Sequence, residues 1–99
     1  MKAETTKNDS TEKNPSASLS SLVWGLSASG LIHLGKQLYP EMEASPPNLP
    51  LAKQTIDTIE MLKEKTEGNL TSEESRLMED VLYQLRLLFV EKTNPGGKP

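Results

Sequence analysis

The feature that most constrains the fold lies in residues 51–92, where helix stop and start signals separate two stretches of helical periodicity. Apolar side chains recur every three or four residues on both sides of Gly68, which is the period of a helix with one buried face. Gly68 suits the left-handed position just past a helix end. Three residues later, Thr71 and Glu74 have the spacing of a capping box, which starts a helix. So short a connection predicts an antiparallel helical hairpin.

The two helices of this hairpin are expected over residues 49–67 and 72–92. Asn48 is a good N-cap for the first of them, and Pro50 is tolerated in a first turn. The expected buried positions are Ala52, Ile56, Ile59 and Leu62, then Leu77, Met78, Val81, Leu82, Leu85, Leu88 and Phe89. Ion pairs spaced by four are expected on the solvated side, namely Lys53–Asp57 and Lys63–Glu67.

A further helix is expected ahead of the hairpin, over residues 18–37. One apolar face holds Leu19, Leu22, Val23, Leu26 and Leu34, with His33 inside it. A second patch holds Trp24 and Leu31, and a groove of small residues spaced by four holds Ser21, Gly25 and Ser29. Such a groove lets another helix approach closely, so both groups are candidate interface residues. The predicted fold class is therefore all-α, with three helices.

The remaining segments have the composition of tails and a linker. Residues 1–17 are polar and are expected to form a disordered N-terminal tail, since they cannot recover the entropy lost on ordering. Residues 93–99 contain Pro and a Gly pair and are expected to form a flexible C-terminal tail. Residues 39–48 are expected to be a proline-rich linker inside one small helical domain, residues 18–92.

The balance of charge argues against nucleic-acid binding. The formal net charge is −3, and residues 51–93 hold nine acidic and six basic side chains. A nucleic-acid surface gathers Lys and Arg, whose charge displaces the counterions of the phosphates. We expect no nucleic-acid partner.

Few side chains in the sequence offer catalytic or metal-binding chemistry. The chain has no cysteine, which removes disulfides, thiolate ligands and Cys nucleophiles and is compatible with the cytoplasm. His33 is the one histidine, so we expect an imidazole at the edge of the core; a pH-responsive contact is the alternative, and a metal site would need further ligands. Caps or solvated faces account for Glu73, Glu74, Glu79 and Asp80. We expect no catalytic residue, metal, cofactor or small-molecule substrate, and no enzyme.

An uncharged stretch, residues 14–35, raises a membrane alternative. It has 22 residues without Asp, Glu, Lys or Arg, which is the length of a membrane span. Six of them are serines, and the gain from each Leu or Val is too small to insert so many polar side chains. We therefore expect residues 18–37 to pack on protein, with interfacial or spanning membrane contact as the alternative.

Tyr83, Leu87 and Val90 lie opposite the expected core face of residues 72–92. Two explanations stay open. The preceding helix and the linker cover these side chains within one chain, or the side chains form a subunit interface, since a small helical domain gains stability from pairing.

Short runs along residues 53–91 carry a resemblance to a known family. They are Lys53-Gln54-Thr55-Ile56-Asp57, Met61-Leu62-Lys63-Glu64-Lys65-Thr66, Gly68-Asn69-Leu70-Thr71, Leu82-Tyr83-Gln84-Leu85-Arg86 and Phe89-Val90-Glu91. These runs resemble the bacterial domain-of-unknown-function family numbered 1844, and Leu31-Ile32-His33-Leu34-Gly35 is similar to the end of its first apolar segment. The proline-rich linker departs from the family pattern. The resemblance implies a small helical bacterial protein and brings no activity, cofactor or catalytic residue.

Together these features predict a non-catalytic helical interaction module in the cytoplasm, self-associating or accessory to a larger bacterial assembly. The alternative function is a peripheral membrane protein that uses residues 18–37 as its anchor. The candidate interface residues are Tyr83, Leu87, Val90, Trp24, Leu31, Ser21, Gly25 and Ser29.

Overall fold

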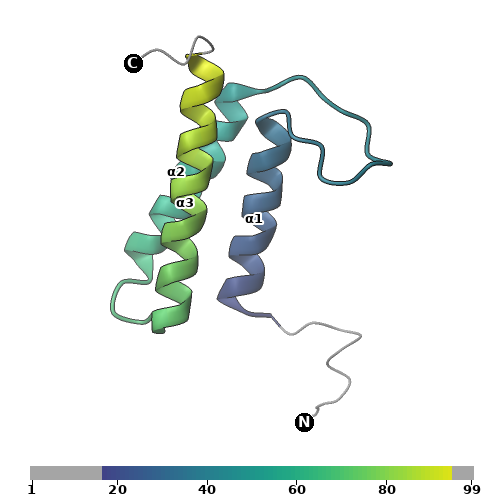
Figure 1. The fold of residues 1–99 in the computed structure, drawn as a ribbon. Coiled ribbons are helices and arrows are strands. Elements are labelled where there is room, and N and C mark those ends of the chain that lie inside the picture. The colour runs from purple at the N-terminus through teal and green to yellow at the C-terminus, as the bar shows by residue number, and fades with distance from the viewer. Residues whose placement is uncertain (1–16, 95–99) are drawn as a thin grey trace.

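A computed structural model of the chain describes residues 17–94, in which three helices form the ordered structure (Figure 1). Helix α1 spans Leu19–His33, α2 spans Leu49–Lys65 and α3 spans Ser72–Thr93. Figure 1 shows α1 and α3 running in one direction and α2 running against both. Each helix packs against the other two, so the predicted all-α fold of three helices is confirmed. Most of the two expected tails, residues 1–16 and 95–99, lies outside the described residues.

Local hydrogen bonds cap the start of both hairpin helices, α2 and α3. The Asn48 side-chain oxygen accepts from the Leu51 N–H at 3.1 Å, which caps α2. The Thr71 hydroxyl accepts from the Glu74 N–H at 3.1 Å, and a Glu74 carboxylate oxygen accepts from the Thr71 N–H at 2.9 Å. This reciprocal capping box starts α3 where the sequence predicts it. Between the helices Gly68 has φ +88°, the left-handed conformation expected of it.

Helix α1 ends at His33, four residues before the expected end at residue 37. Gly35 has φ +90°, and its N–H donates to the Ile32 carbonyl at 2.9 Å, while the Lys36 N–H donates to the Leu31 carbonyl at 2.9 Å. These two bonds form a Schellman motif, which closes a helix with a left-handed glycine. The expected end was wrong because Gly35, rather than the residues after it, is the stop signal.

The linker after α1 returns to its own starting point. The Asn48 N–H donates to the His33 carbonyl at 2.6 Å, and a Cβ on Gly35 would lie 3.1 Å from Pro47 Cγ. Inside the loop, the Gln37 side chain donates to the carbonyls of Pro40 and Met42. The end of α1 and the start of α2 are therefore tied together by direct contacts.

The core lies between the three helices, and α1 enters it through small residues. Fully or nearly fully buried apolar side chains are Val23, Leu34, Ala52, Ile56, Ile59, Met78, Val81, Leu82 and Leu85. Ser27 and Gly30 are also buried, and a Cβ on Gly30 would lie 3.1 Å from both Leu85 methyls and 3.3 Å from Thr55 Cγ2. The α1 backbone thus comes close to both partners at Gly30.

Leu22, expected in the apolar core face of the first helix, is instead 49% exposed. The buried side of α1 is centred near Ser27 and Gly30. A prediction from apolar periodicity overlooks both residues, because neither has a large apolar side chain. The buried face is therefore rotated about the helix axis relative to the expected face, and Leu22 lies outside the core.

Candidate interaction surface

The side chains that could act in catalysis or bind a metal lie at helix ends or in ion pairs. His33 is half-buried at the last residue of α1, and its backbone carbonyl accepts the bond from Asn48. Glu74 completes the cap of α3, and a Glu79 carboxylate oxygen lies 3.9 Å from Lys63 Nζ on α2. Within residues 17–94, no three His, Asp or Glu side chains gather closely enough to hold a metal ion. The apolar surface, rather than these groups, is the unexplained part of the molecule.

Three exposed apolar side chains occupy successive turns of α3. Tyr83 is 69% exposed, Leu87 is 47% exposed and Val90 is 55% exposed. Their spacing of four and three residues places them on one side of the helix, and we name them the α3 stripe. The explanation that the first helix and the linker cover these side chains is therefore wrong for the described residues.

A shallow depression of about 330 Å³ lies beside the α3 stripe. It is lined by the stripe together with Lys63, Glu79, Leu82 and Arg86, and it shares these four residues with a wider open groove toward the α2–α3 turn. Neither α1 nor the linker contributes a lining residue. The stripe therefore borders the open side of the hairpin, across the bundle from α1.

Two ion pairs cross this open side from α2 to α3. Arg86 pairs with Glu60, and Lys63 pairs with Glu79 at 3.9 Å, instead of the expected partner Glu67. All four side chains are close to half exposed. The groove between the two helices is thus bridged by paired charges, while the apolar surface is confined to α3.

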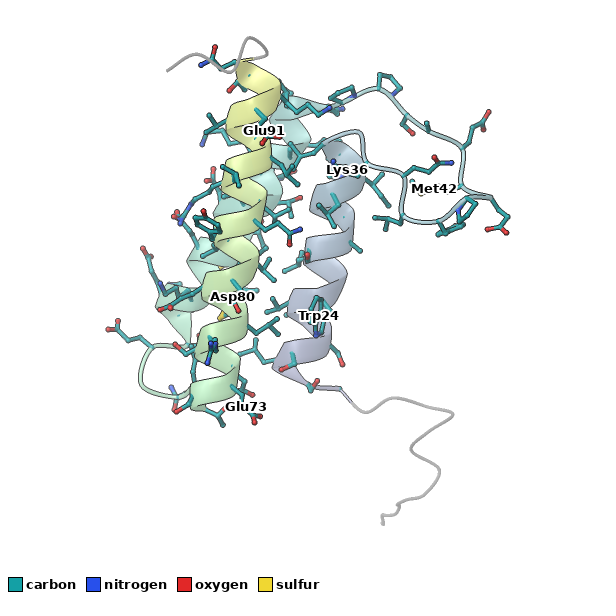
Figure 2. All side chains as sticks on the ribbon, in the orientation of Figure 1. Trp24, Lys36, Met42, Glu73, Asp80 and Glu91 are labelled. Carbon is teal, nitrogen blue, oxygen red and sulfur yellow. The ribbon has the colours of Figure 1, made fainter. Side chains whose placement is uncertain are left out.

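The outer side of α1 carries no charge and exposes two large apolar side chains, Leu22 and Trp24, the second of which is labelled in Figure 2. Trp24 is 59% exposed, whereas Leu31 packs against the core, so the two residues of the expected second patch are separated. The candidate groove residues Ser21, Gly25 and Ser29 are all exposed. A Cβ on Gly25 would meet nothing within 4 Å, so nothing in the described fold requires a glycine there.

Comparison with known proteins places the chain in a family. The model of a family described as a domain of unknown function, DUF1844, matches residues 16–91. The chain belongs to the DUF1844 family. The match begins ahead of α1, so the DUF1844 domain comprises α1, the linker and the hairpin. No curated protein and no solved structure matches the chain. The DUF1844 description names no activity, so the function is inferred from the surfaces of this fold.

Sequence reasoning singled out Tyr83, Leu87 and Val90, which are exposed in this DUF1844 domain, but it missed two other features of the surface. Leu22 was expected in the core, so its exposure beside the uncharged α1 surface was not anticipated. The pairing of Glu60 with Arg86 was also missed. A helical wheel of each helix places these two charges at the edge of its core face, which is the signal that could have found the pair.

The DUF1844 fold also bears on the membrane alternative. Across residues 17–94, no helix combines the length and the apolar character that crossing a membrane requires.

Proposed function

We propose that this protein is a non-catalytic helical interaction module whose binding surface is the α3 stripe. The observation that carries the proposal is the exposure of Tyr83, Leu87 and Val90 on successive turns of a helix whose other side is core. Isolated exposed apolar residues are normal, but a contiguous apolar strip on a folded domain is typical of an interaction site. The partner classes are a second copy of the chain or a larger bacterial assembly in the cytoplasm.

The setting of the α3 stripe supports a protein partner. Tyrosine is enriched at interfaces because its ring is large and loses little conformational freedom on binding. The helix under the stripe is held by a complete capping box and by buried Leu82 and Leu85. A surface that is already ordered loses less entropy when a partner binds.

The test is a mass determination and an affinity capture that compare the wild type with Leu87→Glu. A charge at the centre of the stripe should lower the mass or release a captured partner, because burying that charge is unfavourable. The matched control is Leu22→Glu on α1, since Leu22 and Leu87 are almost equally exposed. Circular dichroism checks that both variants fold. If Leu87→Glu changes neither mass nor partner, the stripe is not an interface.

A second candidate function is interfacial membrane contact through α1. It is favoured by the exposure of Trp24 and Leu22 on a helix without charged residues. Trp24 is the one tryptophan of the chain, so its fluorescence reports directly on this surface. A blue shift on adding lipid vesicles, retained in Leu87→Glu and lost in Leu22→Glu, would support this function. An unchanged wild-type spectrum would contradict it.

A further inference from the structure

We infer that the α3 stripe and the groove beside it bind a basic amphipathic helix of another protein. The inference rests on the proposed function and names the chemistry of the partner. It follows from the shape of the groove, from unpaired carboxylates on both sides of the stripe and from the charges of the chain's own helices.

The surface beside the α3 stripe is a groove between α2 and α3. The depression of about 330 Å³ at the stripe continues into an open groove of about 820 Å³ that leads to the α2–α3 turn. Leu82 lines both parts, and Leu70 lines the part near the turn. An amphipathic helix that binds a groove of this kind lays one apolar face into it. The stripe and the groove together therefore suit a helical segment.

Unpaired carboxylates line the groove side of the stripe. Glu64 and Glu67 both line the open groove and are exposed, and within residues 17–94 neither has an ion-pair partner. Lys63, the expected partner of Glu67, pairs with Glu79 instead. Among the described residues that line the groove, Arg76 is the one base outside an ion pair. The unpaired charge in the groove is therefore negative, with two acids against one base.

A second row of carboxylates follows the other side of the stripe. Asp80 lies three residues before Tyr83. Glu91 lies four residues after Leu87, and both spacings make side chains neighbours on a helix surface. Glu73, seven residues before Asp80, extends the row to the first turn of α3 (Figure 2). All three carboxylates are exposed, and no described residue forms an ion pair with any of them.

The α3 stripe therefore lies between two sets of negative charges that have no partner within the fold. A helix with Lys or Arg at both edges of its apolar face would place these bases opposite the carboxylates. Such complementarity speeds association and suppresses partners of the wrong charge. An acidic helix would bring like charges together, and an anionic membrane surface would be repelled in the same way. The charges thus favour a basic helix over both.

The chain's own helices do not have this chemistry. Helix α1 has no Lys, Arg, Asp or Glu, α2 has three bases and three acids, and α3 has three bases and five acids. None of the three described helices carries a net positive charge. A second copy that docked through one of them would leave the carboxylates beside the stripe unpaired, so the partner is another protein.

The exposure of the site sets the strength of binding. A single helix on the stripe covers less than the roughly 800 Å² per partner of a standard interface. Charges that are open to solvent are screened by salt. We therefore expect a dissociation constant between about 10 μM and 1 mM at physiological salt, with tighter binding at lower salt.

Three synthetic peptides test the chemistry of the partner. Each is a helix of about 18 residues, about 27 Å long, with leucines spaced by three and four on an alanine background and with Lys, Gln or Glu at both edges of the apolar face. Fluorescence anisotropy of each labelled peptide, titrated with the full chain, measures binding. The Lys peptide should bind at least about tenfold more tightly than the Glu peptide, with the Gln peptide between them, and salt should reduce the difference. Equal binding of the three peptides would overturn the inference.

Charge-reversal variants locate the bound Lys peptide. The double variant Glu64→Lys with Asp80→Lys changes one carboxylate on each side of the stripe and should weaken binding at least about tenfold. The matched control is Glu41→Lys with Glu43→Lys, which changes the net charge equally in the exposed linker. The control should have little effect, because charges are screened over about 8 Å at physiological salt. Equal weakening by both double variants would mean attraction to net charge alone and would overturn the inference.

Leu87→Gln separates a failure of the inference from a failure of the proposed function. Loss of Lys-peptide binding in this variant, with Leu22→Gln unaffected, places the apolar face of the peptide on the stripe. If the Gln or Glu peptide binds best and its binding requires Leu87, the basic partner is overturned and the interaction surface stands. If Leu87→Gln weakens no peptide, and Leu87→Glu changes neither mass nor captured partner, both are overturned.

Discussion

Helix α1 and the α2–α3 hairpin are built on different principles. The hairpin has charged and apolar sides, a reciprocal capping box, a left-handed Gly68 between its helices and ion pairs from one helix to the other. Helix α1 has no charged residue and is nearly as apolar on its outer side as on its inner side. The hairpin therefore follows from local signals, whereas the orientation of α1 depends on which of its sides fits the hairpin.

The presence or absence of charged residues also distinguishes the two exposed apolar surfaces, the α3 stripe and the outer side of α1. Charges flank the α3 stripe, with Arg76 and Asp80 at one end and Arg86 along one side, so a partner bound there would have to match an orientation. The outer side of α1 offers no charge that could select a partner or a direction. Specificity needs unfavourable alternatives as well as favourable contacts, which is why we propose the α3 stripe, rather than the outer side of α1, as the recognition surface.

Leu85→Ala is expected to have the largest effect, because this side chain serves both regions. Leu85 is fully buried on α3, and its methyls lie against Gly30 of α1, where an added Cβ would be 3.1 Å from both. Removing them should lower the free energy of unfolding by about 3 kcal/mol, as for other buried leucines. Urea denaturation followed by circular dichroism measures the loss. Leu51→Ala, at a 40% exposed position, is the control; equal losses in both variants would contradict the central role of Leu85.

Two glycines of α1 provide the next test. Gly25→Ala should stabilise the protein by about 1 kcal/mol, because alanine is the better helix former and the site is open. Gly30→Ala gains the same propensity but places a methyl group 3.1 Å from Leu85, at an overpacking cost of about 1–3 kcal/mol. The two variants should therefore differ by about 2 kcal/mol in thermal or urea unfolding. Equal stabilities would show that α1 does not pack through Gly30.

Thr71→Ala examines the local signals of the hairpin. It removes the hydroxyl that accepts from the Glu74 N–H, and loss of such an N-cap costs about 1 kcal/mol. The neighbouring variant Ser72→Ala leaves both bonds of the capping box in place and should be nearly neutral in the same urea unfolding experiment. Should both variants unfold like the wild type, the capping box contributes nothing measurable.

The smallest effect is expected for the ion pair between Glu60 and Arg86. Both side chains are about half exposed, and pairs of this kind contribute about 0.2–1 kcal/mol. A double-mutant cycle with Glu60→Gln and Arg86→Gln should give a coupling energy in this range at low salt, and a smaller one in 1 M NaCl because salt screens exposed charges. A larger, salt-independent coupling would mean that this side of the hairpin is less exposed to water than the structure shows.

The sequence was most reliable where a single turn of backbone decides the outcome. Thr71, Glu74 and Gly68 have the predicted roles because capping bonds and a left-handed glycine involve residues close in the chain. The end of α1 was predicted too late, although Gly35 is a local signal of the same kind. Lys63 was assigned to Glu67 along its own helix, and the structure brings Glu79 of α3 to it. That pairing depends on how two helices pack.

By itself the sequence determined three helices, their starts and the hairpin turn, because helix caps and turns depend on hydrogen bonds and φ angles within a few residues. Only the tertiary structure decided which side of α1 is buried. Ser27 and Gly30 add little to apolar periodicity, yet their small size is what lets the α1 backbone approach Leu85. The exposure of Tyr83, Leu87 and Val90 was decided in the same way, because it depends on the side of the hairpin on which α1 packs.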